Sequence, residues 1–387
     1  MSMQSFRELG VSAPVVDALA ARAVHSPFPI QEAVLPDAMA GLDVLVRSPT
    51  GSGKTLAFAL PIVERTLPTD KRPTALVLVP TRELAAQVEA EFRPLTRAKG
   101  LSVAVAYGGL PLRSQAQKAK SAQILVATPG RLQDFVERRM VDLSGIRTLV
   151  LDEADRMLDM GFKPQVDRIV RRLPRNRQTM FFSATLDGEV GQLAREYTNS
   201  PSQFGAESRE AVAEIEHQFV SVTADSKVET LVEHLKASAS TLVFVRTKRG
   251  ADRLVTKLAR HGVRAVSMHG DMTQKARQRA LADFESGKVG VLVATDVAAR
   301  GLDLDDITHV INFDPPDEDK GYVHRTGRTG RAGRNGTAIT LVLPEQQADT
   351  SRVARRLGHT EQFERAGMKS ARSKVLYTSR RGRRSKW

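Results

Sequence analysis

A chain of 387 residues is long enough for two domains with full hydrophobic cores, at about 150 residues per domain. It contains no cysteine, which excludes disulfide bonds and cysteine-based zinc sites. The formal net charge of +14 indicates a polyanionic partner, and residues 351–387 alone hold twelve Lys/Arg against two Glu. No apolar run reaches membrane-spanning length, and Met1–Val11 lacks the apolar segment of a signal peptide. We therefore expect a cytoplasmic protein without membrane contact.

The first ligand-binding candidate is the proline-rich run Pro27–Gln31, which follows a helical lead-in. Proline fixes its own backbone and restricts the residue before it, so we expect Gln31 in an extended segment. A carboxamide matches the N6/N7 edge of adenine, and Phe6 could stack on the same base. From local sequence alone, a proline-stiffened loop with an exposed glutamine is the simpler interpretation.

The run Pro49–Thr55 lies between a predicted strand at Asp43–Arg47 and a predicted helix at Leu56–Thr66. Its Thr-Gly-Ser-Gly-Lys-Thr core is typical of a phosphate-binding loop, although the first glycine of the strict pattern is missing. Backbone N–H groups and the helix N-terminus would face the phosphates, with Lys54 on the β- and γ-phosphates and Thr55 on Mg²⁺. The alternative is an ordinary glycine-rich turn.

Three further apolar strands are predicted at Ala75–Val79, Val103–Tyr107 and Ile124–Ala127. Each ends in hydroxyl, glycine or arginine residues, and the carboxyl ends of parallel strands share one edge of a sheet. Such groups suit a phosphodiester backbone, although each is also an ordinary helix cap. The residues are Thr81, Arg82, Glu83, Gly109, Thr128, Gly130 and Arg131.

Leu149–Asp155 reads as a buried strand that ends in three carboxylates within four residues. One carboxylate could hold Mg²⁺ and another could handle a water molecule, whereas the alternative is a solvated acidic turn. A further strand at Thr179–Phe182 is followed by Ser183 and Thr185, whose hydroxyls could bond to these carboxylates.

The segment Gln203–Glu216 is polar and shows no strand pattern, so we place a linker at 207–214, between domains at 1–206 and 215–350. Alternating strands and helices then predict a second parallel α/β domain without a phosphate loop of its own. Its strands are expected at His217–Val222, Thr241–Val245, Ala265–Met268, Val289–Ala294, His309–Phe313 and Thr337–Val342.

Tyr322–Gly333 places His324, Arg325, Arg328 and Arg331 among three glycines. Arginines at this spacing could point into a nucleotide bound by another domain, which is the arginine-finger role in phosphoryl transfer. The alternative is a solvated basic loop.

In their order and spacing, these motifs resemble those of DEAD-box ATP-dependent RNA helicases over roughly residues 4–345. They include Pro-Phe-Pro-Ile-Gln, Thr-Gly-Ser-Gly-Lys-Thr, Asp-Glu-Ala-Asp, Ser-Ala-Thr and His-Arg-Thr-Gly-Arg-Thr-Gly-Arg. The resemblance implies an α/β fold of two tandem RecA-like domains, each a parallel β-sheet flanked by helices, that close on ATP and single-stranded RNA.

The resemblance also implies roles at the nucleotide. Asp152 with Thr55 would organise Mg²⁺, Glu153 would activate the attacking water, and Arg328 and Arg331 would be the fingers. Adenine, phosphate and ribose contacts would come from Phe6, Gln31, Thr50, Gly51, Ser52, Gly53, Lys54, Thr55 and Asp303.

For RNA, the resemblance implies backbone contacts on both domains. They would come from Thr81, Arg82, Glu83, Gly109, Thr128, Gly130, Arg131, Arg246, Gly270, Arg277 and Thr295. Hydrolysis would be coupled to RNA through Asp155, Ser183, Thr185 and His324. Phe28 departs from the family, which usually has threonine there.

We therefore expect RNA-stimulated ATP hydrolysis coupled to local unwinding of short RNA duplexes and RNP remodelling, in a monomeric core. An ATP-gated RNA clamp or assembly platform is the alternative, and a DNA helicase is a weaker one. Ribosomal or RNA-decay assemblies are possible partners. Residues 351–387 are expected to form a basic, partly disordered RNA-binding tail, or otherwise a solubility tail.

Overall fold

The computed structural model describes residues 4–48, 52–186, 188–205, 215–236, 238, 240–299, 304, 307–330 and 335–370. The chain divides into two compact units, each of which is considered by itself. The expected linker at 207–214 lies outside the described residues. Among the helices of the described part, none is long and apolar enough to cross a membrane.

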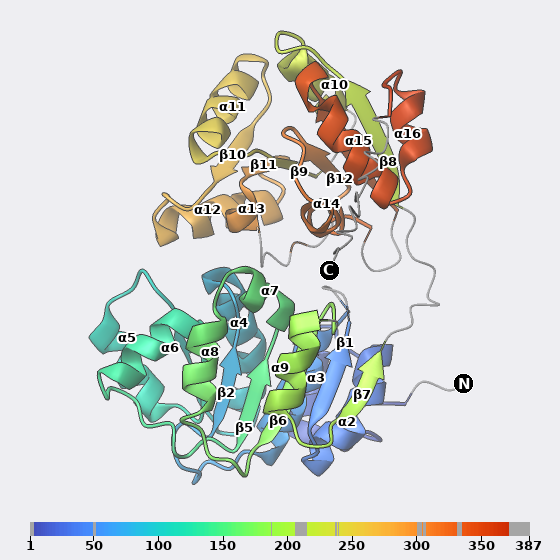
Figure 1. Cartoon of the computed structure of the whole chain (residues 1–387). Helices are drawn as coiled ribbons and strands as arrows, with labels where there is room; N and C mark the ends of the chain where they lie inside the picture. Colours follow the sequence, from blue (N-terminus) through green and yellow to red (C-terminus); the bar gives the residue numbers. More distant parts are fainter. Residues whose placement is uncertain are drawn as a thin grey trace, which may run out of the picture. The chain divides into compact units, whose positions relative to one another are not determined.

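The first unit is built on a seven-stranded sheet in the order β3-β4-β2-β5-β6-β1-β7, in which every pairing is parallel (Figure 1). Its strands are β1 (Val44–Arg47), β2 (Ala75–Leu78), β3 (Val103–Ala106), β4 (Ile124–Ala127), β5 (Thr148–Leu151), β6 (Gln178–Ser183) and β7 (Ser202–Gly205). Its helices are α1 (Ala13–Ala20), α2 (Pro29–Ala40), α3 (Lys54–Arg65), α4 (Arg82–Ala98), α5 (Leu112–Ser121), α6 (Pro129–Glu137), α7 (Ala154–Asp159), α8 (Lys163–Val170) and α9 (Gly188–Tyr197).

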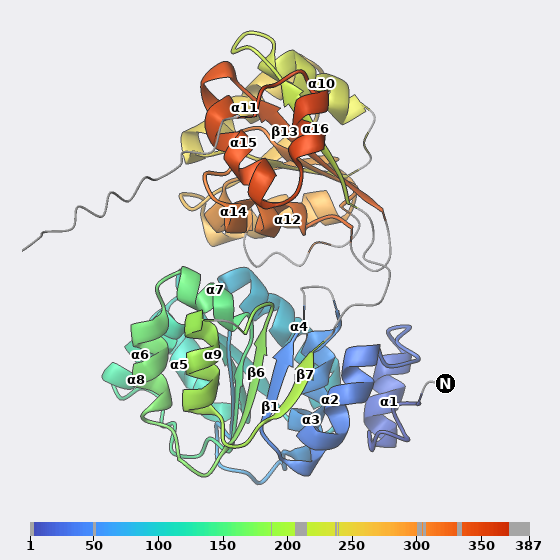
Figure 2. The same ribbon diagram turned by 45° about the vertical axis from the view of Figure 1, so that its right-hand side comes forward.

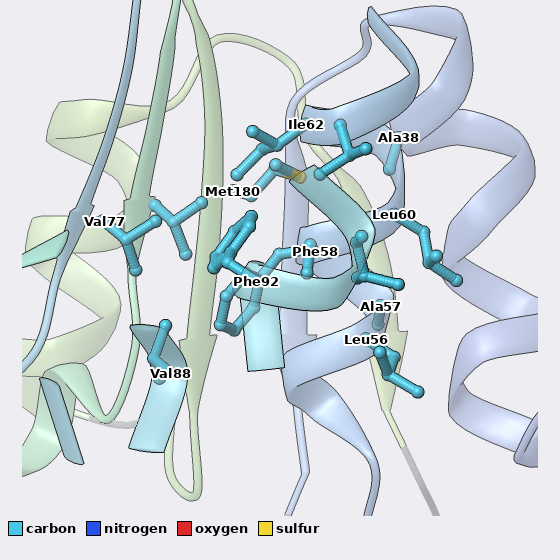
Figure 3. Close-up of a cluster of buried hydrophobic side chains, with 14 of the residues drawn as sticks. Ala38, Leu56, Ala57, Phe58, Leu60, Ile62, Val77, Val88, Phe92 and Met180 are labelled. Atoms are coloured by element: carbon cyan, nitrogen blue, oxygen red, sulfur yellow. The ribbon is translucent and has the colours of Figure 1, made fainter. Parts of the chain in front are cut away.

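Two separate apolar clusters cover the two faces of this sheet, because successive strand residues point to opposite sides. On one face, Val77 and Met180 pack with Phe58 of α3 and Phe92 of α4 (Figure 3). On the other face, Leu149 and its neighbours pack under α5 to α9. Burial on both faces explains why these strands are continuously apolar in sequence. Each fully buried phenylalanine such as Phe58 contributes up to about 3 kcal/mol to stability.

The second unit contains a six-stranded parallel sheet in the order β10-β11-β9-β12-β13-β8. Its strands are β8 (Ile215–Ser221), β9 (Thr241–Phe244), β10 (Ala265–Met268), β11 (Val291–Ala294), β12 (His309–Asn312) and β13 (Gly336–Val342). Its helices are α10 (Lys227–Lys236), α11 (Lys248–Arg260), α12 (Gln274–Glu285), α13 (Asp296–Ala299), α14 (Asp319–Thr326), α15 (Gln347–Arg356) and α16 (Thr360–Arg365), with a 3₁₀ turn at Pro344–Gln346.

The expected fold class, two parallel-sheet α/β units flanked by helices, is confirmed. Two local expectations are wrong. The edge strand β7 begins where we expected no strand, and its alternately exposed residues pair only with β1. The basic tail expected from residue 351 is helical through α16 (Figure 2), and Val353, Phe363 and Met368 are buried in one cluster with Phe219 of β8. Residues 371–387 lie outside the described part.

Candidate functional site

The phosphate-binding loop joins the carboxyl end of β1 to the N-terminus of α3. Lys54 is buried, and its Nζ donates a hydrogen bond to the Ser48 carbonyl oxygen at 2.8 Å. The Ser48 and Ser52 hydroxyl oxygens lie 2.5 Å apart. The Ser48 N–H donates to the carbonyl of Ser183 at the end of β6, at 3.0 Å. These bonds therefore fix the start of the loop to the edge of the sheet, and the Lys54 side chain reaches back to the Ser48 carbonyl.

Gln31 lies in the first turn of α2, so the expectation of an extended segment is wrong. Pro29 occupies the first helical position, where proline is favoured because its missing N–H would have no intrahelical partner. Gln31 Oε1 accepts from the Phe28 N–H at 3.0 Å, and Nε2 donates to the Gly53 carbonyl at 2.8 Å. This buried side chain therefore links α2 to the phosphate loop.

Phe28 is a feature of this site that sequence reasoning did not place. Gly53 has a φ of +83°, and a Cβ there would lie 2.6 Å from Gln31 Nε2 and 2.8 Å from Phe28 Cδ2. Only glycine fits such a close approach. The Phe28 ring thus lies against the phosphate loop, with 52% of the residue exposed. The available signal was an aromatic residue three positions before Gln31, at the N-cap of the same helix.

Phe6 does not stand open to a base, contrary to the expected stacking role. It is 2% exposed and belongs to the apolar cluster that includes Leu9, Val15 and Leu19. The ring therefore contributes to the core of the first unit.

The acidic run follows β5 at the carboxyl edge of the sheet. Asp152 is buried, and its Oδ1 accepts from the Glu153 N–H at 2.9 Å. Glu153 has φ 51° and ψ 50°, a left-handed conformation that costs roughly 1–3 kcal/mol for a residue other than glycine. Its Oε2 accepts from Arg156 Nη1 at 2.5 Å, and both side chains are 9% exposed. No sequence motif predicts Arg156 as the partner of this carboxylate.

The surroundings of Asp152 suit a cation. Burial raises the pKa of Asp152 to about 7, with Lys54 opposing the rise and Glu153 adding to it. A cation at this carboxylate would offset the cost of burying its charge. The Asp152 carboxylate and the half-buried Thr55 hydroxyl supply oxygen ligands, which Mg²⁺ prefers. The residues present therefore fit a Mg²⁺ ion.

The hydroxyls after β6 differ from expectation. We expected Ser183 and Thr185 to bond to the carboxylates. Ser183 Oγ instead accepts from the backbone N–H of Asp155 at 3.3 Å, because β5 and β6 are neighbouring strands. Thr185 is exposed, and its hydroxyl bonds to no described residue. The contact between the two motifs therefore runs through the backbone of Asp155.

The loop after β2 has the expected capping geometry. Thr81 is the N-cap of α4, and its Oγ1 accepts from the Leu84 N–H at 3.2 Å. Glu83 is buried in the first turn of this helix. A Cβ at Gly109 would lie 2.7 Å from Arg82 Nη1, so the guanidinium group covers the glycine turn after β3. Arg82 and the backbone near Gly109 are thus brought together at one edge.

Arg131 in α6 is held on the same unit. Its Nη1 donates to the Leu110 carbonyl at 3.0 Å and to Gln115 Oε1 at 2.6 Å. Burial lowers its pKa, with Asp134 opposing and Arg82 adding to the shift. The space next to Gly130 is open, since a Cβ there would meet nothing within 4 Å. The strand ends of β2, β3 and β4 thus assemble one basic, glycine-containing edge, with Thr128 as the N-cap of α6.

In the second unit, Arg325 is a structural residue and not a finger. Its Nε and Nη2 each donate to the Asp296 carboxylate at 2.6 Å, and Nη1 donates to Asn312 Oδ1 at 3.1 Å. Arg328 follows at the end of α14, and its Nε donates to the His324 carbonyl at 3.3 Å.

The strand ends of this unit carry the other expected RNA residues. Arg246 follows β9, and its Nη2 pairs with Asp317 at 2.9 Å. Gly270 follows β10, Thr295 follows β11, and Arg277 lies in α12. Thr50, Gly51, Asp303 and Arg331 lie outside the described residues.

Two family models match the chain: "DEAD/DEAH box helicase" over residues 28–193 and "Helicase conserved C-terminal domain" over residues 226–333. The chain belongs to the DEAD-box ATP-dependent RNA helicases.

Its relatives include the DEAD-box ATP-dependent RNA helicase CshA of Streptococcus pneumoniae, which is 42% identical over 345 residues, covering 88% of this chain and 66% of that protein. CshA of Listeria monocytogenes is 41% identical over 348 residues, covering 89% of this chain and 67% of that protein. The chain thus spans about two thirds of the length of these relatives. Among solved structures, S. cerevisiae Dbp5 bound to RNA and ADP BeF3 matches with a TM-score of 0.79 and 30% identity, covering 95% of each chain.

Proposed function

We propose that the chain is a cytoplasmic, RNA-stimulated ATPase that locally separates short RNA duplexes and remodels RNA–protein assemblies. One observation carries this proposal. The phosphate-loop lysine, Lys54, which follows β1, and the carboxylates Asp152 and Glu153, which follow β5, are all buried at the carboxyl edge of one parallel sheet. The first unit would serve as the nucleotide-binding domain (1–206), and the second as the helicase domain (215–350).

At the nucleotide, the phosphates would replace the Ser48 carbonyl as the partner of Lys54. Asp152 and Thr55 would hold Mg²⁺, which when bound neutralises phosphate charge. Glu153 would accept the proton of the attacking water, and its ion pair with Arg156 would orient the carboxylate. By resemblance to the family, Arg328 and Arg331 would stabilise the negative charge that develops on the γ-phosphate.

RNA would bind through its sugar-phosphate backbone, because the candidate residues supply arginine, hydroxyl and backbone N–H groups at strand ends. Arg82 and the turn at Gly109 would contact one strand in the first unit, together with the open backbone at Gly130. Contacts to the backbone and the 2′-hydroxyl favour RNA over DNA without reading sequence. The hydrogen bond from the Asp155 N–H to Ser183 Oγ would transmit changes at the carboxylates of the acidic run to the end of β6.

The substitution Glu153→Gln tests the assignment. We expect ATP and RNA binding to persist while RNA-stimulated turnover falls by roughly 100-fold or more, because the amide cannot accept the proton. Glu89→Gln is the matched control, since Glu89 also pairs with an arginine one turn further along a helix, Arg93, away from the site. Phosphate release in single and multiple turnover gives the readout.

Undiminished turnover in Glu153→Gln would contradict the general-base role. A strand-displacement assay distinguishes a helicase from an ATP-gated RNA clamp. Displacement of a short RNA strand supports the helicase, whereas ATP-dependent retention of RNA without displacement supports the clamp. Stimulation by DNA equal to that by RNA would contradict the preference for RNA.

A further inference from the structure

A groove on the first unit lies between the C-terminal halves of α6 and α8, which are side by side in both views (Figures 1 and 2). Its volume is about 250 Å³. The α6 helix runs away from the carboxyl edge of the sheet because it follows the end of β4, and α8 leads to the start of β6 at the opposite edge. The groove therefore lies outside the nucleotide site and the glycine-containing edge. It is lined by Gln133, Val136, Glu137, Arg168, Ile169, Arg171 and Arg172.

The arginines of this groove are exposed and unpaired. Arg168, Arg171 and Arg172 form no ion pair and no side-chain hydrogen bond with any described residue. Arg138 and Arg139, which directly follow α6, are likewise exposed and unpaired within the described part. Other exposed arginines of the described part, such as Arg260, are also unpaired, so what distinguishes these five is that they lie together at the ends of two neighbouring helices. We call these five residues and the groove between them the arginine groove.

Nearby acidic residues are already engaged. Glu137 Oε1 accepts from Gln133 Nε2 at 2.5 Å. Asp167 accepts from the Tyr197 hydroxyl and pairs with Lys163 at 3.6 Å, and Asp134 lies 3.8 Å from Arg131. The arginine groove therefore keeps an excess of positive charge, and its guanidinium groups can bind an anion without first breaking an ion pair.

We propose that the arginine groove binds the phosphodiester backbone of RNA that extends beyond the strand held at the glycine-containing edge. This inference rests on the proposed function. The α6 helix begins at the expected RNA contact, Thr128–Arg131, and ends at the groove, so its nine residues separate the two sites by about 13 Å. A few nucleotides of flanking RNA span that distance. Planar guanidinium groups bind phosphates in a bidentate manner, independently of base sequence.

The test compares wild type with the double variant Arg168→Gln/Arg172→Gln. The control is Arg260→Gln/Arg264→Gln, which removes two exposed arginines with no described partner at the end of α11. Binding of labelled oligouridylate is measured by anisotropy against salt, with a short strand that fills only the edge site and a strand several times longer. We expect the groove variant to bind the long strand roughly tenfold more weakly, with a salt slope lower by about 1.4, and the short strand normally.

Unchanged affinity and slope for the long strand would overturn the proposal. Equal losses in the control would also overturn it, because they would reflect net charge alone. Competition by poly-glutamate as effective as that by RNA, lost in the groove variant, would assign the groove to an acidic protein segment instead. Binding is measured without ATP, so failure of RNA to stimulate wild-type ATPase would contradict the proposed function and leave the groove result readable.

Discussion

At the scale of single residues, the site depends on a few contacts that sequence motifs do not specify. The motif shows that Gln31 and Gly53 are present, but their hydrogen bond exists only because α2 is capped by Phe28 beside the loop. Proline before glutamine suggested an extended chain, whereas proline at a first helical position produces a helix. The same local sequence permits both outcomes, and packing against the loop selects one of them.

Gln31→Ala should therefore have two effects. Loss of the carboxamide leaves the partly buried Gly53 carbonyl without its donor, which costs about 1 kcal/mol. It should also weaken discrimination of ATP from GTP, because the group expected to read adenine is gone. Gln178→Ala is the matched control, since Gln178 also donates to backbone carbonyls within this unit, those of Ala38 and Leu42. Thermal unfolding and nucleotide competition measure the two effects. Unchanged selectivity would contradict the adenine contact.

At the scale of elements, the apolar strands were predictable because burial on both faces leaves a continuous apolar run. β7 was not, because this edge strand is half exposed and has one partner. Helices α15 and α16 were not predicted, because their basic residues indicated a charged tail, although Val353 and Phe363 are buried. A long arginine side chain at the surface does not prevent its helix from packing on the other side. The prediction from net charge therefore placed the start of the tail too early in the chain.

The packing of α16 should be sensitive to pH. His217 of β8 stacks on His359 with ring centroids 3.9 Å apart, and its Nδ1 lies 2.9 Å from the Tyr322 hydroxyl. Burial lowers the pKa of His217 from 6.5 to about 4, and the charge of His359 adds to this. Burial also lowers the pKa of His359. The folded state thus holds both rings neutral, while the unfolded chain takes up protons below about pH 6.5.

The stabilisation should consequently be complete above pH 6.5 and should decline as the pH falls towards 4. We expect this loss to be about 2 kcal/mol, after allowance for the partial exposure of His217. The variant His217→Phe should keep the ring stack but should not lose stability as the pH falls. The control His261→Gln, at an exposed histidine of the same unit, should show the same pH dependence of stability as wild type. Urea unfolding at pH 7 and pH 4.5 compares the three proteins. A pH dependence of equal size in His217→Phe would contradict the role of this pair.

At the scale of the whole molecule, most of the candidate site followed from one rule: parallel strands carry ligand-binding residues at their carboxyl ends. That rule predicts that Lys54, Asp152 and Thr81, which follow three different strands, lie at one edge of the sheet, although it specifies no distances between them. It does not supply the contacts between neighbouring loops, such as the cover of Gly109 by Arg82, because these depend on side-chain packing. It also does not reveal the arginine groove, since that surface is formed by two helices distant in sequence.

Deletion of Ser370–Trp387 should weaken RNA binding and flatten its salt dependence. The segment holds seven Lys/Arg and no acid, so its removal halves the formal charge of +14. Each lost phosphate contact should lower the salt slope by about 0.7 for single-stranded RNA. Turnover at saturating short RNA should be unchanged, because the residues proposed for catalysis remain. Identical salt slopes in the two proteins would make the segment irrelevant to RNA.

The left-handed backbone of Glu153 has a consequence for engineering. Glycine adopts this conformation without penalty, whereas Glu153 adopts it at a cost that its buried ion pair with Arg156 offsets. Replacement by glycine would relieve the backbone strain, but it would leave the buried Arg156 without its carboxylate and remove the group proposed to act on water. Stabilisation campaigns on this chain should therefore keep residue 153 fixed, because its cost in folding free energy and its expected benefit in turnover are carried by the same residue.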